Sequence, residues 1–135
     1  MTIVTRPEHM RGGFEKHHVD GLPIAAAFHH ITEPDGDQAH DHPWDFTTHV
    51  LAGWYREEVF IIDRDGWWTS CITRRLPGAA YQVQASHIHR IIEVSPGGCW
   101  TLVTPGDARR ETLFWRFVEG RQAQSRPWHQ QEFDT

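Results

Sequence analysis

Long apolar runs, clustered cations and cysteines are all scarce in this sequence. No stretch approaches the roughly 18 apolar residues of a membrane-spanning helix, and the start, MTIVTRPEHM, lacks the apolar core of a secretory signal peptide. Two cysteines, Cys71 and Cys99, are too few for a secreted domain that depends on disulfides, so we expect both to be reduced and buried in strands. We therefore expect a cytoplasmic protein without a membrane partner.

The charge balance excludes another class of partner. The chain has a net charge of -5 and no block rich in Lys or Arg, whereas binding to a phosphate backbone needs clustered cations. Nucleic acid is therefore not expected, and a small molecule is the predicted partner. With 135 residues, of which 39% are hydrophobic and 23% charged, the sequence predicts one soluble globular domain.

Short runs of β-branched and aromatic residues, separated by Gly, Pro and Asp, indicate an all-β chain. No segment of about twelve residues has a clear period of 3.6, so helix is expected only in short turns. Strands at this spacing predict a sandwich or barrel, with a core over about residues 22–118 and a tail or barrel cap at 119–135. The expected strands are residues 22–32, 46–53, 54–63, 67–75, 80–84, 88–95, 98–104 and 111–118.

Histidine is frequent, with 11 in the chain, and it is clustered. His40 and His42 are separated by one residue, so on an extended segment both imidazoles point to the same side and can bind one ion. His87 and His89 repeat this spacing farther along the chain. Because histidine is the commonest metal ligand, a metal site is the first hypothesis for these residues.

The first of these segments resembles the first motif of the cupin family, G-x5-H-x-H-x(3,4)-E-x6-G. His40, His42 and Gly53 match the motif. The acidic ligand of the motif is missing, because its two allowed spacings fall on Phe46 and Thr47. The motif's glutamate is therefore absent, and Asp45 would be its substitute if the strand starts one residue earlier or later.

Residues 78–93 resemble the second cupin motif, G-x5-P-x-G-x2-H-x3-N. Gly78 and His89 keep both their identity and their spacing. The proline, second glycine and asparagine of the motif are replaced by Gln84, Ser86 and Glu93. The resemblance implies His89 as a third metal ligand.

A longer stretch resembles a group of small bacterial and phage cupins with the motif HDHPWDF. The matching segments are FHHITEPDGDQAHDHPWDFTTHVLAGWYREE at 28–58, QASHIHRI at 84–91, CWTLVTPGD at 99–107 and FWRF at 114–117. This resemblance implies one cupin domain over residues 1–135, folded as a double-stranded β-helix, or jelly-roll barrel. It also implies a homodimer, because small cupins often exchange edge strands.

The resemblance implies that His40, His42 and His89 hold one divalent metal ion. The fourth ligand stays open between water and three side chains, and the same side chains are the candidate proton carriers. These candidates are Asp45, His49 and His87.

Other charged residues have ordinary interpretations. Glu57 and Glu58 follow a hairpin on a strand that looks exposed, so they are interpreted as solvated charges. Arg90 and Arg110 have the planar fork that pairs with a substrate carboxylate, but we expect them to form surface salt bridges.

Three neutral imidazoles leave coordination positions open, whereas structural zinc sites are usually closed by four ligands. Fe(II), Zn, Mn, Ni and Cu all suit such a site, with Fe(II) or Zn expected first. The predicted function is a metal-dependent enzyme for a small polar metabolite, using iron oxygenase chemistry, as in thiol dioxygenases, or zinc Lewis-acid isomerisation or rearrangement. The alternatives are a non-catalytic cupin that binds a metal or small ligand as a sensor or accessory protein, which the missing glutamate favours, and a purely structural barrel.

Overall fold

The computed structural model describes residues 4–9, 14–36, 38–130 and 133, which contain strands and turns and no helix. It follows that no helix in this part of the chain is long and apolar enough to cross a membrane. The strands are β1 (Val4–His9), β2 (Phe14–Asp20), β3 (Ala26–Ile31), β4 (Ala39–His40), β5 (Phe46–Ala52), β6 (Tyr55–Ile62), β7 (Trp68–Arg75), β8 (Ala80–Val83), β9 (Ile88–Val94), β10 (Cys99–Pro105), β11 (Leu113–Arg116) and β12 (Gln124–Pro127).

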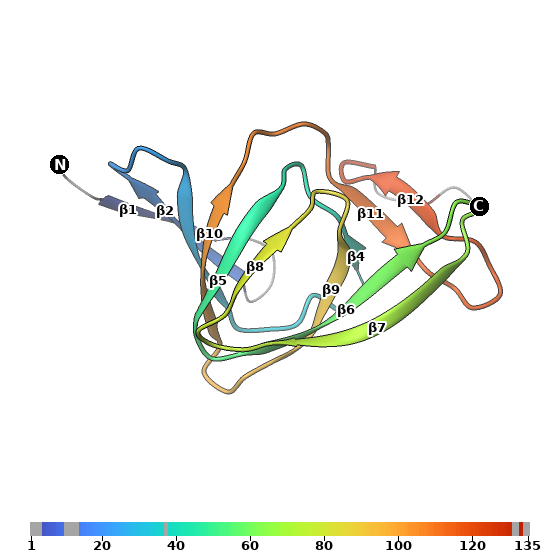
Figure 1. The fold of residues 1–135 in the computed structure, drawn as a ribbon, viewed down its shortest axis with the longest axis horizontal. Coiled ribbons are helices and arrows are strands. Elements are labelled where there is room, and N and C mark those ends of the chain that lie inside the picture. Colours follow the sequence, from blue (N-terminus) through green and yellow to red (C-terminus); the bar gives the residue numbers. More distant parts are fainter. Residues whose placement is uncertain (1–3, 10–13, 37, 131–132, 134–135) are drawn as a thin grey trace.

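The strands form two antiparallel sheets that pack against each other (Figure 1). The first sheet has the order β1-β2-β3-β10-β5-β8, and the second has the order β12-β11-β4-β9-β6-β7. Neighbouring strands often come from distant parts of the sequence, as with β3 beside β10 and β4 beside β9. Two antiparallel sheets whose neighbouring strands are distant in the sequence form a jelly roll. The all-β prediction is confirmed.

Each expected strand range overlaps one strand, and the structure adds β1, β2, β4 and β12. β1 and β2 form a hairpin that extends the first sheet beyond the expected core, and ion pairs from Arg6 to Asp20 and from His18 to Glu8 join the two strands. At the other end β12 pairs with β11, and the Phe133 ring lies near the Arg116 guanidinium, 4.9 Å from its centre. Segments that look polar in the sequence therefore add to both sheets.

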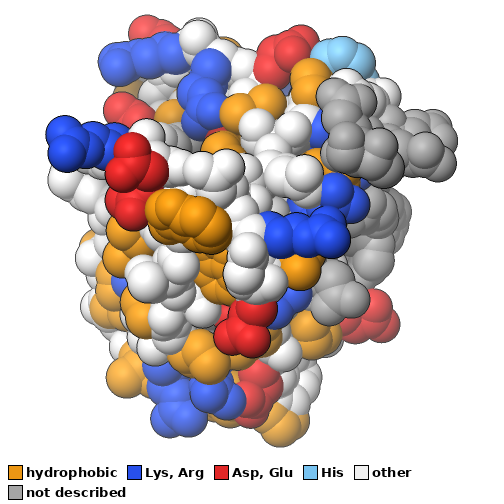
Figure 2. Space-filling model, turned by 90° about the vertical axis from the view of Figure 1, so that its right-hand side faces the viewer, with side chains coloured by type: hydrophobic (Ala, Val, Ile, Leu, Met, Phe, Trp, Pro, Cys, Tyr) orange, Lys and Arg blue, Asp and Glu red, His pale blue; other side chains and the backbone are white. Residues whose placement is uncertain are grey.

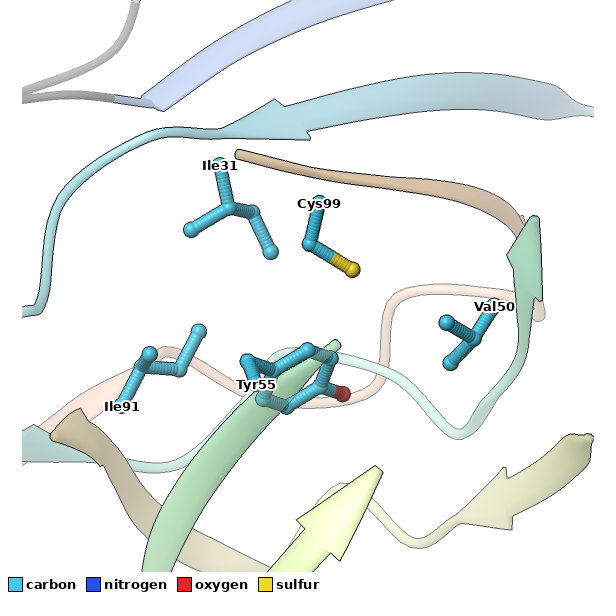
Figure 3. Close-up of a cluster of buried hydrophobic side chains, with 5 residues drawn as sticks. All are labelled: Ile31, Val50, Tyr55, Ile91 and Cys99. Carbon is cyan, nitrogen blue, oxygen red and sulfur yellow. The ribbon is translucent and has the colours of Figure 1, made fainter. Parts of the chain in front are cut away.

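Side chains along each strand point alternately to the two faces of its sheet, and those on the inner faces form the interior between the sheets. Ile31, Val50 and Cys99 of the first sheet meet Tyr55 and Ile91 of the second, and all five are buried (Figure 3). Burying side chains of this size contributes about 1.5–3 kcal/mol each, which makes this cluster a main source of stability. The opposite face of the second sheet has its own cluster, made of Ala39, Phe60 and Ile88 with partly buried Ile62, Trp68, Trp115 and Phe117.

The turn between β5 and β6 needs glycine at position 53. Gly53 has a φ of +75°, and a Cβ there would lie 2.3 Å from the Gly98 carbonyl oxygen and 2.6 Å from Ser95 Oγ. The side chain of Ser95 also receives the backbone N–H of Trp54 at 3.0 Å. The motif glycine thus lets two turns close one end of the barrel.

The two cysteines have different environments. Cys99 is fully buried in the interior cluster, as expected. Cys71 is exposed, so the expectation of burial is wrong for this residue. It lies on β7, an edge strand of the second sheet, where neither face is fully covered. Both thiols are free.

Candidate metal centre

The backbone brings the three predicted histidine ligands together. His40 ends β4 and lies directly opposite His89 of β9 in the antiparallel ladder, while His42 follows β4 by two residues. The ring centroids are 4.8 Å apart for His40 and His89, 5.0 Å for His42 and His89, and 5.4 Å for His40 and His42. One potential ligand nitrogen from each ring lies within 4.8 Å of the others, so small side-chain rotations would allow nitrogen bonds of about 2.0–2.1 Å to one ion.

Asp41, between the first two histidines, fixes their segment to β11. Its carboxylate accepts hydrogen bonds from Leu113 N at 2.7 Å, Trp115 Nε1 at 3.0 Å and an Arg110 guanidinium nitrogen at 2.9 Å. The Asp41 N–H also donates to the Leu113 carbonyl at 3.0 Å. Because Asp41 is buried on one side of the chain, His40 and His42 are held toward the other.

The electrostatic environment keeps two of the histidines in the form that binds metal. Burial, assisted by the neighbouring His89, lowers the pKa of His40 to about 4. Burial, followed by the charges of His89, His40 and His87, lowers the pKa of His42 to about 2. Both rings are therefore neutral near pH 7, as a metal ligand must be.

The hydrogen bonding of these rings also fits a metal ion. Nδ1 of His42 is buried and has no hydrogen-bond partner among the described residues. Nδ1 of His40 makes only a 3.4 Å contact with the Gln38 carbonyl oxygen, and Nδ1 of His89 is engaged by Glu57. Since a buried polar atom without a partner destabilises a protein, an ion bound by His42 Nδ1 and by the ring nitrogens of His40 and His89 that make no hydrogen bond is consistent with the donor set.

Glu57 of β6 supports His89 from behind. Its Oε2 accepts a hydrogen bond from His89 Nδ1 at 2.6 Å, which leaves Nε2 of that ring for an ion. Burial alone would raise the pKa of Glu57, but contacts with His87 and His89 and the charge of Arg75 outweigh burial and lower it. The earlier interpretation of Glu57 as a solvated charge is wrong, because the residue is only 2% exposed.

The three predicted proton carriers lie in different places. His87 Nε2 is buried 3.5 Å from Glu57 Oε1, and Glu57, His87 and His89 form a second group able to hold a cation. His49 lies on β5 between the buried residues Thr48 and Val50, so alternation directs it away from the interior. The carboxylate of Asp45 accepts the Ala85 N–H at 2.7 Å, and its side chain is 56% exposed.

The two arginines considered for substrate binding form ion pairs, as expected, but the pair of Arg110 is not a surface salt bridge, because its partner Asp41 is only 2% exposed. Arg90 pairs with Glu58 at 2.6 Å, and Arg110 pairs with Asp41 at 2.9 Å.

Two surface cavities lie apart from the histidines. The first, of about 590 Å³, lies on the outer face of the second sheet, and the second, of about 520 Å³, lies beside β7. None of the three predicted ligands lines either cavity. On the side of the molecule in Figure 2, acidic, basic and hydrophobic side chains are intermixed among the described residues, without a field of one sign. The walls of the first cavity include Phe60, Trp68, Trp115, Phe117, Glu58 and Arg90.

Comparisons with known proteins show which fold this architecture belongs to. No protein-family model and no curated protein matches the sequence. Among solved structures, Bacillus subtilis oxalate decarboxylase matches with a TM-score of 0.55 and 18% identity over 79% of this chain. KdgF from Halomonas sp. matches with a TM-score of 0.53 and 18% identity over 78% of this chain. The chain has the cupin fold.

The chain corresponds to different shares of its structural neighbours. It spans 28% of the oxalate decarboxylase chain and 89% of the KdgF chain. Mn(II) centres are described for the Bacillus enzyme. At such identities the likeness establishes the fold, so the activity must be inferred from this chain's own residues. Membership of the HDHPWDF group stays a prediction.

Sequence reasoning missed two residues that organise the site. Asp41 stands inside the H-x-H segment, but only the folded chain shows that β11 surrounds its carboxylate. Glu57 does leave a signal in the sequence, because it shares a strand face with Tyr55, which is buried. What the sequence does not show is that His89 and Arg75 both reach this carboxylate.

Proposed function

We propose that this cupin is a metal-dependent enzyme acting on a small polar metabolite, with one divalent ion held by His40, His42 and His89. The observation that carries the proposal is the convergence of three buried or partly buried imidazoles, two with lowered pKa values and the third oriented by a carboxylate. A carboxylate behind a ligating histidine is a common feature of functional metal sites.

The proposed site is open. Three protein ligands leave positions for water or substrate, as catalytic metal sites require. An Fe(II) ion there would supply oxygen chemistry, and a Zn ion would supply Lewis-acid chemistry. Among the proposed proton carriers, His87 has the best-placed ring, because it lies beside Glu57 and 5.2 Å from the His89 ring.

A second candidate function is a non-catalytic cupin that binds a metal or small ligand. It is favoured by the position where the motif has its glutamate. Phe46, at one of the two allowed spacings, packs its ring 4.9 Å from that of His42, and so offers an apolar wall where a carboxylate ligand is expected.

The test is metal content, measured by plasma mass spectrometry on untagged protein purified without chelator or nickel resin. The proposal expects about one ion per chain in the wild-type protein and its loss in a His40→Ala/His89→Ala double variant. Iron would favour oxygenase chemistry, and zinc would favour isomerisation or rearrangement. A wild-type protein that binds no metal after reconstitution with Fe(II), Zn, Mn, Ni and Cu would contradict the enzyme proposal.

A further inference from the structure

The barrel has a seam at which its two sheets end. β8 is the last strand of the first sheet, and β7 is the last strand of the second. Among the described strand pairings, β7 pairs only with β6 and β8 pairs only with β5. Residues 76–79 connect these two strands and hydrogen-bond to Val50 of β5, and side chains supply further contacts between the strands.

Arg75, at the end of β7, reaches across the seam. Its guanidinium carbon lies 4.2 Å from the centre of the Tyr81 ring on β8, within the range of a cation–π interaction. The same side chain is only 17% exposed, so this contact lies largely away from solvent. Arg75 thus adds a side-chain contact between β7 and β8, which do not pair with each other among the described strands.

The guanidinium of Arg75 also holds the carboxylate behind the metal centre. Nε and a terminal nitrogen donate to the same oxygen of Glu57, at 3.0 and 2.8 Å, while the other oxygen accepts His89 Nδ1 at 2.6 Å. A continuous set of contacts therefore runs from the Tyr81 ring through Arg75 and Glu57 to the imidazole of His89.

We propose that Arg75 is a positioning residue that sets the metal-binding orientation of His89 through Glu57, and that Glu57 is not itself a metal ligand. This inference rests on the proposed function, because it assumes that His89 binds the ion. The predicted consequence is that a residue on the seam, outside the ligand set, controls metal affinity.

The same contacts argue against a separate cation at Glu57, His87 and His89, although these three groups lie close enough together to hold one. Both oxygens of Glu57 already accept hydrogen bonds, and the donor on one of them is the permanent positive charge of Arg75. A second cation would have to displace these donors and lie beside a guanidinium. The geometry instead assigns Glu57 to the orientation of His89.

The test compares Arg75→Gln with Arg74→Gln, a matched control on the neighbouring residue, whose guanidinium lies over the Trp54 ring at 5.0 Å. Zn(II) and Co(II) affinities of the metal-free full-length chain are measured by competition with a chelator. Arg75→Gln and Glu57→Gln should each weaken binding about 10- to 100-fold, as expected when a group that orients a ligand is lost. Arg74→Gln should stay within about twofold of wild type.

Two further measurements separate positioning from general damage to the fold. If Arg75 acts through Glu57, the Arg75→Gln/Glu57→Gln double variant should lose little more affinity than either single variant. The visible absorption of bound Co(II) should keep its intensity in Glu57→Gln, because no ligand is removed. Arg75→Lys keeps the charge without the planar fork, so it provides a folded variant with an intermediate loss of affinity.

Several results would overturn the inference. Wild-type affinity in Arg75→Gln or Arg75→Lys would show that Arg75 positions nothing, additive losses would show that it does not act through Glu57, and a changed Co(II) spectrum in Glu57→Gln would make Glu57 a ligand. If the wild-type chain binds neither Zn(II) nor Co(II), this inference fails, whereas the proposed function fails only if Fe(II), Mn, Ni and Cu do not bind either. If it binds and the Arg75 variants bind equally well, only this inference fails.

Discussion

Buried carboxylates organise the proposed metal centre, and each is satisfied in a different way. Glu57 is balanced by a guanidinium and an imidazole, whereas Asp41 accepts donors from a backbone amide, an indole and a guanidinium. Removing such a group leaves its buried partners unpaired, which destabilises a protein more than the loss of an exposed pair. These residues are therefore predicted to affect both folding and the site.

The Asp41→Ala variant tests this prediction at the H-x-H segment. The substitution removes three hydrogen bonds and leaves donors of Leu113 and Trp115 unpaired, so the free energy of unfolding should fall by about 3 kcal/mol or more. Asp45→Ala is the matched control, since this exposed residue accepts one bond from Ala85 N and should cost about 1 kcal/mol or less. Urea denaturation of metal-free protein measures both, and equal losses would contradict the prediction.

His29 is predicted to make stability depend on pH. Burial first, and then the charges of Lys16 and His18, lower the pKa of His29 to about 4 from its usual value near 6.5. Below about pH 6.5 the unfolded chain binds a proton at this residue that the folded chain excludes, so stability is full above that pH and falls toward pH 4.

The measurement is denaturant unfolding of wild-type protein and His29→Gln between about pH 7.5 and pH 4. The wild-type protein should lose about 3 kcal/mol more than the variant across this window, because Gln cannot take up the proton. Parallel curves would show that the His29 ring does not contribute to the pH dependence.

At the scale of strands and turns, Gly53 and Gly78 separate two effects of glycine. Both have positive φ, of +75° and +87°, but a Cβ at Gly53 would meet Gly98 O at 2.3 Å, whereas a Cβ at Gly78 would meet nothing within 4 Å. Gly78→Ala should therefore lower stability by only about 1 kcal/mol, the cost of the backbone conformation. Gly53→Ala should lower it by about 3 kcal/mol or more, because the turns must also separate. Thermal unfolding of both variants measures the two losses of stability. Similar losses would contradict the close contact between a Cβ at position 53 and the Gly98 carbonyl oxygen.

The sequence predicted most of the strands, but it did not predict features that depend on contacts between strands distant in the sequence. Alternating apolar residues and turn signals predicted every strand from β3 to β11 except β4, a two-residue segment that exists only because β9 and β11 flank it. The same limit applies to the site. Motif spacing predicted three histidines that the structure brings together, but no local pattern shows that Arg75 of an edge strand reaches Glu57.

At the scale of the whole molecule, the proposed ion joins segments that are far apart in the sequence. β4 and β9 meet only in the folded barrel, so an unfolded chain does not present His40 beside His89. An ion that binds only the folded state stabilises it in proportion to the logarithm of its concentration above Kd. An ion at the proposed site would therefore link β4 and β9 of the second sheet, in addition to serving as a candidate reaction centre.

Adding Zn(II) or Fe(II) should consequently raise the melting temperature of the metal-free chain. At an ion concentration about 100 times Kd the gain is about 2.7 kcal/mol, which corresponds to roughly 10 °C for a domain of this size. The His40→Ala/His89→Ala variant should show no such shift. A His30→Ala/His129→Ala variant removes the same number of imidazoles from other parts of the chain and should keep the shift. Scanning calorimetry measures all three proteins, and an equal rise in both double variants would mean that the ion binds dispersed histidines and not the proposed centre.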